Sequence, residues 1–296
     1  MQLSNNTKLL GAISVTITSI CYGLVPSFSF LAFGMGVETE TLLFNKFLYA
    51  SIIMWAYLFI RKIPFRFEKK TALTMLIACA GYVGMSTALY ISFDYISGSL
   101  ATIVSFTFPA MIVAIEMVTG MEPVKFVKIL AVLLSFGGLV LIVWDPDMQA
   151  NLIGIFFAFV SAIGYVVYIF GLGSKRVKAE NSFAVAGYVM LFAAMVNFIR
   201  CLVSGKPLFA TEPNQFGMMI LLSEVCVFLA ILFYAIGVRL VGPGNAALIN
   251  TLEPVLACIF GHFIIGDVLT KIMLFGSALV VTAVLITNLP EKHKSD

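Results

Sequence analysis

The chain has 296 residues, of which 61% are hydrophobic and only 11% are charged, and its mean hydropathy is +1.05. This composition excludes an ordinary soluble globular protein, because such proteins carry more than twice this share of charged residues. The net charge of +3 is mild and gives no indication of a nucleic-acid partner.

Nearly all of the sequence consists of apolar runs that are long enough to cross a membrane, since about 20 residues of helix span the hydrocarbon core. The runs are continuous rather than alternating, which predicts an all-α membrane protein and not a β-barrel. The segments between them are too short for a soluble catalytic domain. The ten predicted membrane helices cover residues 9–32, 41–60, 72–92, 97–118, 124–144, 151–173, 182–204, 214–238, 244–265 and 271–289.

The positions of the basic residues predict the topology. If the N-terminus is cytoplasmic and ten helices alternate in direction, 14 of the 18 Lys and Arg residues fall on the cytoplasmic side. Only Arg200, Lys206 and Lys271 fall outside, and Lys46 lies within a helix. Because cytoplasmic loops carry an excess of Lys and Arg, this distribution predicts an N-in, C-in arrangement.

The sequence also contains an internal repeat. A shift of 145 residues overlays about fifty positions starting at Ile96 on those starting at Val241, and a shift of 143 aligns the beginnings of the two halves. Two blocks in the same order at nearly equal offset predict two five-helix repeats, residues 1–148 and 149–296. The matched pairs include Ala101 and Ala246, Pro109 and Pro254, Glu122 and Asp267, Gly11 and Gly154, Thr18 and Ser161, and Tyr22 and Tyr165.

Five is an odd number, so the second repeat enters the membrane from the opposite side to the first. Inverted-topology repeats are typical of secondary transporters, whose substrate sites lie near the membrane midplane between the repeats. Pro109 and Pro254 fall near the midpoints of their helices and predict matched kinks at that depth. The alternative is that the two prolines only shape curved helices.

Several motifs resemble those of a known family. Residues 245–257, with Glu253-Pro254 inside them, are similar to the second-half signature of the drug/metabolite transporter superfamily (EamA type), as is Gly266-Asp267. Residues 99–101, Pro109 and Glu122 resemble the first-half signature. The resemblance implies ten helices in an inverted repeat around a central cavity, which move small metabolites by alternating access.

The chain departs from that family pattern at three places. Tyr22-Gly23 stands where the family often has Trp-Gly, Lys46 where it has arginine, and Asp267 where it has glutamate. These changes are mild for the fold, but they loosen any inference about the substrate.

Two carboxylates fall at the centre of the predicted membrane. Glu253 in the ninth helix and Glu224 in the eighth each lie about 15 Å deep at 1.5 Å per residue. A carboxylate there must be paired, protonated or in contact with water. If the two share a cavity, one would hold a proton that can be exchanged across the membrane. The alternative is a hydrogen-bonded acid that never titrates.

Four other polar side chains are candidates. Pro254 leaves the backbone carbonyl of Asn250 without its helical hydrogen bond, and the side chain of Asn250 is expected either to satisfy the freed backbone or to contact the solute. Tyr22 and Tyr165 are expected to face inward and wall the cavity. Lys46 either extends to the membrane interface or reaches a carboxylate of solute or protein. Glu116 is expected at the cytoplasmic interface near Lys125 or Lys128, outside the site.

The sequence therefore predicts a multi-pass secondary transporter of the plasma (inner) membrane that moves a small polar or amphipathic, amino-acid-like metabolite and is coupled to protons in one version of the hypothesis. Glu253 would bind proton or solute, with Glu224 and Asn250 in support. No cofactor, metal or nucleic acid is expected, lipids surround the protein, and it is a monomer or a homodimer. The alternatives are a channel-like conductor, a non-transporting scaffold and an intramembrane enzyme acting on lipid-linked substrates.

Overall fold

A computed structural model describes residues 5–96, 98–121, 125–143, 151–210, 212–266 and 268–288, and in these ranges the regular structure is entirely helical. Glu122, Asp267 and the predicted boundary at residue 148 lie outside the described residues. The helices are α1 (Asn5–Gly34), α2 (Thr39–Ile60), α3 (Lys69–Phe93), α4 (Gly98–Ser105), α5 (Phe108–Thr119), α6 (Phe126–Val143), α7 (Leu152–Gly173), α8 (Lys175–Ala179), α9 (Ser182–Ser204), α10 (Pro213–Leu221), η1 (Leu222–Phe228), α11 (Leu229–Val241), α12 (Pro243–Asn250), α13 (Leu252–Phe260), η2 (Gly261–Ile265) and α14 (Lys271–Asn288), where η marks a π-helical segment.

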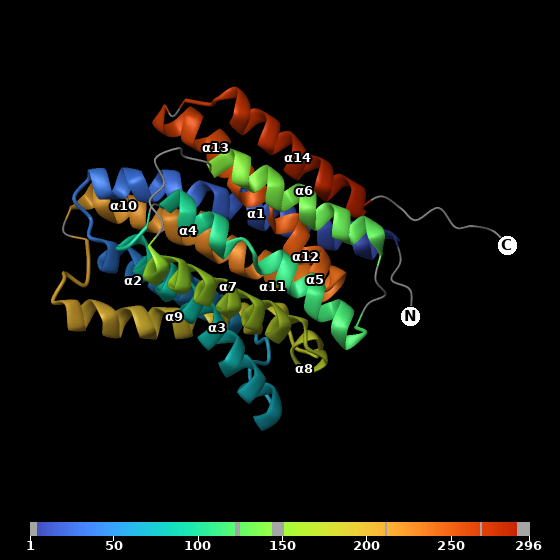
Figure 1. Ribbon diagram of the computed structural model, residues 1–296. Helices are drawn as coiled ribbons and strands as arrows, with labels where there is room; N and C mark the ends of the chain where they lie inside the picture. The colour runs from blue at the N-terminus through green and yellow to red at the C-terminus, as the bar shows by residue number, and fades with distance from the viewer. Residues whose placement is uncertain are drawn as a thin grey trace.

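Eight helical stretches of the described chain are long and apolar enough to cross a membrane. Two further apolar helices, Phe126–Ile142 and Lys271–Ile286, are shorter and correspond to the fifth and tenth predicted runs. The protein is therefore a multi-pass helical membrane protein. Figure 1 shows that α1 begins and α14 ends at the same end of the bundle, which requires an even number of crossings.

Local signals explain where several helices begin and end. The side chains of Asn151 and Asn181 accept hydrogen bonds from backbone N–H groups two residues later, at 2.9 Å in both cases, and so cap α7 and α9. Gly120 and Gly205 follow α5 and α9 with φ of 66° in both cases, a left-handed conformation that glycine adopts without steric cost.

Two spans are interrupted at matched positions. The fourth span breaks between α4 and α5, after Ser105, and the ninth breaks between α12 and α13, after Asn250. These two residues are 145 positions apart, the same offset that aligns the repeats. Pro109 and Pro254 lie in the first turn of the helix that follows each break, where proline's missing N–H does no harm.

Contacts between the two halves come in reciprocal pairs, in which equivalent residues of each half contact the other half. Gly11 of α1 packs against Leu240 and Val241, and its repeat mate Gly154 of α7 packs against Tyr95 and Ile96, each 145 positions earlier. The helix pairs correspond as well. Helix α1 of the first half packs on α11 of the second, and α7 of the second half packs on α3 of the first. Helices α6 and α14, the last of each half, lie side by side along one edge of the bundle (Figure 1).

Glycines let some of these helices approach closely. A Cβ added to Gly138 would lie 2.5 Å from the carbonyl oxygen of Gly276, and one added to Gly276 would lie 2.5 Å from that of Gly138. Helices α3 and α7 approach in the same way. A Cβ added to Gly81 would lie 2.8 Å from the carbonyl oxygen of Gly164, and one added to Gly164 would lie 2.8 Å from that of Gly81. Small residues at such crossings permit backbone contact, which is the main source of helix association in lipid.

Candidate functional site

The break between α12 and α13 places an amide and a carboxylate side by side. Asn250, the last residue of α12, is fully buried, and its Nδ2 donates to Oε2 of Glu253 at 3.1 Å. The same Nδ2 donates to the hydroxyl of Tyr165 at 3.3 Å, while Oδ1 accepts from Ser19 of α1 at 3.3 Å. Asn250 is therefore held by three helices and fixes the orientation of the carboxylate.

Five tyrosines from four helices surround this group, and we refer to Tyr22, Tyr82, Tyr165, Tyr168 and Tyr234 as the tyrosine cluster. Tyr165, Tyr168 and Tyr234 stack on one another, with ring centroids 6.0 to 6.1 Å apart and interplanar angles of 8° to 23°. Tyr82 tilts against Tyr168 at 4.9 Å, and Tyr22 lies close to Tyr82. The cluster joins α1 and α3 of the first half to α7 and α11 of the second.

Three hydroxyls of the tyrosine cluster lack a hydrogen bond of standard geometry within the described residues. The Oη atoms of Tyr22, Tyr168 and Tyr234 are all inaccessible to solvent. A buried hydroxyl without a partner costs about 1–3 kcal/mol. Three of them in one cluster indicate a place where a polar ligand or water completes the bonding.

Glu253 has no positive partner in the part of the chain that the structure describes. The ion pairs found there join Lys128 to Glu116 and Lys206 to Glu38. The groups that act electrostatically around Glu253 are instead tyrosines, namely Tyr82, Tyr165 and Tyr234. The carboxylate is thus turned toward the tyrosine cluster, and the protein supplies it with one amide donor and no balancing charge.

Glu224 does not belong to this group. It lies in η1, the π-helical middle of the eighth span, and its Oε1 accepts a hydrogen bond from Ser223 at 3.2 Å. No interaction joins it to Glu253 among the described residues. The structure therefore gives no support to a shared pair of acids, although π-helical segments are often found at functional sites.

Lys46 is buried in α2, with 7% of its surface exposed, so its side chain does not extend to the surface of the bundle. Its Nζ lies 5.2 Å from the ring centroid of Phe47, and Cys226 of η1 is its electrostatic neighbour. No interaction joins Lys46 to Glu253 within the described residues. Of the six predicted site residues, Glu253, Asn250 and Tyr165 are joined by hydrogen bonds and Tyr22 lies beside Tyr165, whereas no interaction joins Glu224 or Lys46 to this group in the described chain.

Glu116 lies within a turn of the end of α5 and close to Lys128, as the sequence predicts. It is buried, with 3% of its surface exposed; one oxygen lies 3.5 Å from Lys128 Nζ, and the other accepts from the backbone N–H of Gly244 at 2.8 Å. Gly244 is the second residue of α12, where backbone donors have no partner inside the helix. The pairing with Lys128 was anticipated; the link across the repeats to α12 was not.

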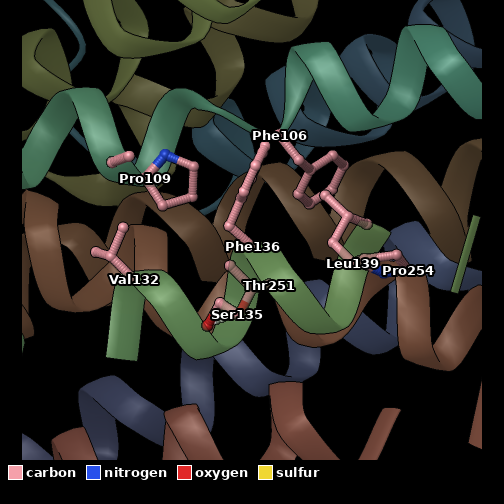
Figure 2. Close-up of a pocket in the computed structure, with 9 residues that line it drawn as sticks. Phe106, Pro109, Val132, Ser135, Phe136, Leu139, Thr251 and Pro254 are labelled. Carbon is pink, nitrogen blue, oxygen red and sulfur yellow. Dashed lines mark hydrogen bonds between the residues drawn. The ribbon is translucent and has the colours of Figure 1, made fainter. Parts of the chain in front are cut away.

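A small pocket lies next to the helix breaks, lined by α5, α6 and the α12–α13 junction (Figure 2). Pro109 and Pro254, the two matched prolines, both contribute to its wall, together with Phe106, Ser135 and Thr251. Its volume is about 10 Å³, which leaves room for no more than one water molecule. The pocket adjoins Pro254 rather than surrounding Glu253, so the region of the breaks is closely packed in this conformation.

Comparisons with known proteins agree with this architecture. The EamA-like transporter family matches the chain twice, over residues 9–144 and 152–289. The uncharacterized transporter YcbK of Bacillus subtilis (strain 168) is 22% identical over 280 residues, covering 90% of this chain and 88% of that protein. The threonine/homoserine exporter RhtA of Escherichia coli (strain K12) is 24% identical over 231 residues, covering 78% and 76%.

One solved crystal structure superposes on the chain with a TM-score of 0.78 and 16% sequence identity. The match covers 95% of this chain and 96% of that one, and at this identity it shows a common fold and nothing about the solute.

Proposed function

Since the chain belongs to the EamA-like transporter family, we propose that it is a secondary transporter of the plasma membrane that moves a small amino-acid-like solute by alternating access. The family and both relatives are transporters, so a small molecule is the partner and transport is the activity. The amino-acid-like solute rests on the name of one relative, a threonine/homoserine exporter, and on the polar group at Glu253.

The proposed topology has ten spans in two inverted repeats, divided near residue 148, with both termini in the cytoplasm. The exchanged contacts of Gly11 and Gly154 support the pairing of the halves. The distribution of Lys and Arg supports the orientation. Two halves of opposite orientation have two nearly equivalent arrangements, one open to each face of the membrane.

Glu253 is the proposed centre of the transport step. Its carboxylate lies beside a helix break, bonded to a buried amide and without a positive partner in the described chain. A carboxylate at such a place in a membrane must be paired, protonated or in contact with water, and either a proton or a bound solute is able to neutralise it. Exchange between the two would couple solute movement to protons, and this single observation carries the proposal.

A contact between the repeats helps to hold this conformation. Glu116 of α5 accepts a hydrogen bond from the backbone N–H of Gly244 in α12 at 2.8 Å. Alternating access requires that contacts of this kind between the halves open and form again.

Counterflow in proteoliposomes tests the proposal. Vesicles loaded with unlabelled solute should accumulate labelled solute through the wild-type protein, with L-threonine and a panel of other amino acids as probes. A Glu253→Gln variant should lose most of this activity, whereas Glu38→Gln, which changes only an exposed ion pair, should keep it. Non-saturating flux without counterflow would identify a channel, and the absence of any solute movement would contradict the proposal.

A further inference from the structure

The group around Glu253 has negative charge, aromatic faces and spare hydrogen-bond acceptors, but within the described residues it has no cation. Building on the function proposed above, we propose that Glu253 and the tyrosine cluster bind the positively charged amino group of the solute. Under this assignment an amine is required for binding, and a carboxylate on the solute is not.

The charge of the site supports a cationic ligand. An ionised carboxylate offers about four acceptor positions, and here Asn250 fills one of them at 3.1 Å. Asn250 has no further N–H to give, because the second N–H of its Nδ2 donates to the hydroxyl of Tyr165. The remaining acceptor capacity of Glu253 is open to an N–H donor that brings positive charge.

The rings of the tyrosine cluster suit the same ligand. Tyr165, Tyr168 and Tyr234 stack as nearly parallel plates, and the electron-rich face of a tyrosine attracts an ammonium group within about 6 Å. A carboxylate ligand would meet the opposite situation, since it would lie beside Glu253 and against the ring faces. Repulsion from both would exclude it.

The unpaired hydroxyls indicate a primary amine. An ammonium group carries three donors, and the oxygens of Tyr22 and Tyr234, which approach Tyr82 and Tyr165, make no hydrogen bond of standard geometry with the described residues. Tyr234 interacts electrostatically with Glu253, and Tyr22 lies close to Tyr165. One ammonium group is thus able to satisfy the carboxylate and the buried hydroxyls together, which a quaternary amine cannot do.

No interaction joins the buried lysine to Glu253 within the described residues. Lys46 contacts Phe47 and Cys226, and Phe47 in turn packs edge-on against Tyr82, with ring centroids 5.9 Å apart. Recognition of the amino group is assigned to Glu253 and the tyrosine cluster, and it requires no contact between Lys46 and the solute.

Protons compete with the amine for Glu253. Tyrosine hydroxyls act on it electrostatically from α3, α7 and α11. Among the helices packed against α13, α6 brings Lys128, which pairs with Glu116, and η2 and α14 bring the exposed His262 and Lys271. None of these supplies a positive charge to Glu253, so acid should weaken amine binding.

Three probes derived from threonine test the assignment on the purified full-length protein in detergent. L-threonine has both charged groups, 1-amino-2-propanol lacks the carboxylate, and 3-hydroxybutyrate lacks the amine. Titration calorimetry and thermal shift should show binding of the two amines, weaker at low pH, and no binding of 3-hydroxybutyrate. Other primary amines and their matched carboxylates extend the panel.

Two variants and a control complete the experiment. Glu253→Gln should weaken amine binding by about tenfold or more, because a charged hydrogen-bond partner is lost. Tyr234→Phe should weaken it less, and Glu38→Gln should not change it. Binding of 3-hydroxybutyrate at equal affinity, unchanged amine binding by Glu253→Gln, or no binding by any amine would overturn the inference. Counterflow of 3-hydroxybutyrate would overturn it while leaving the transporter proposal intact.

Discussion

The two halves of the molecule share a helix break at equivalent positions, but the side chains that follow the two breaks differ. Each has a span that breaks at the same repeat position, after Ser105 in one half and after Asn250 in the other. Three residues further on, the first half has Phe108, whose ring packs against Tyr165 at 4.4 Å, and the second half has Glu253. Both repeats have the break, but an acidic residue occupies this position only in the second.

This difference explains why a symmetric fold has a single charged site. The first break is filled by an aromatic contact and a weak polar one, the Ser105–Ser161 hydroxyl pair at 3.2 Å. The second is polar throughout, because Asn250 and Glu253 replace the residues that would fill it. The symmetric pair of breaks would serve the alternating access proposed above, and the proposed binding group lies at only one of them.

The largest expected effect comes from making the first half resemble the second. Phe108→Glu places a carboxylate in a position that is 1% exposed, packed on Tyr165, and without a donor like Asn250. An uncompensated buried charge of this kind should destabilise the protein by about 3–5 kcal/mol. Thermal unfolding in detergent measures this; Phe108→Leu is the control and should cost less. Equal stability of the two variants would show that the halves are chemically interchangeable.

The shared backbone contacts are tested at the crossing of α6 and α14. Gly138→Ala puts a methyl group 2.5 Å from the carbonyl oxygen of Gly276 and should cost up to about 3 kcal/mol through forced separation of the helices. Gly137→Ala is a matched control on the adjacent residue, because nothing lies within 4 Å of its added Cβ. If both substitutions change the melting temperature alike, the close approach is not a stabilising feature.

A smaller effect should come from Glu116, which has no acidic counterpart in the second half because Gly261 occupies the equivalent position. Glu116→Gln removes the charge that faces Lys128 and weakens the bond to the N–H of Gly244, which should cost about 1–2 kcal/mol. The open N-terminus of α12 should also bring faster hydrogen exchange of its amides. Unchanged exchange in α12 would mean that the contact does not hold this helix.

The smallest expected effect is at the exposed ion pair between Lys206 and Glu38, whose side chains are 41% and 50% exposed. Glu38→Gln should change stability by less than about 1 kcal/mol, since solvent screens such pairs. Raising the salt concentration should remove even that difference between the variant and the wild type.

The sequence was sufficient for the family and for the helical membrane architecture, because long apolar runs and repeated motifs are local features. It also pointed to the region of the breaks, since a proline following a glutamate in an apolar run is visible without a structure. It did not indicate Tyr82, Tyr168 or Tyr234. Each sits in an apolar run of its own, and only the packing of α3, α7 and α11 brings the rings together.

Glu116 and Glu224 also show that the sequence does not predict which neighbours a side chain contacts. Counting residues from a helix end gives depth but not direction, and direction decides which neighbours a side chain meets. Glu116 also accepts a hydrogen bond from the backbone N–H of Gly244 in α12, a contact that its predicted depth does not reveal. Glu224 and Glu253 have similar predicted depths, yet they belong to different helices and do not interact within the described chain.

Proton movement that accompanies solute exchange is the most direct measurement of the central role assigned to Glu253. Proteoliposomes that enclose a pH-sensitive dye should report proton flux when a transported amine is added to the wild-type protein. The account predicts that Glu253→Gln abolishes this flux and leaves any residual solute exchange independent of pH. A Glu253→Gln protein that still moves protons with solute, with the pH dependence of the wild type, would contradict it.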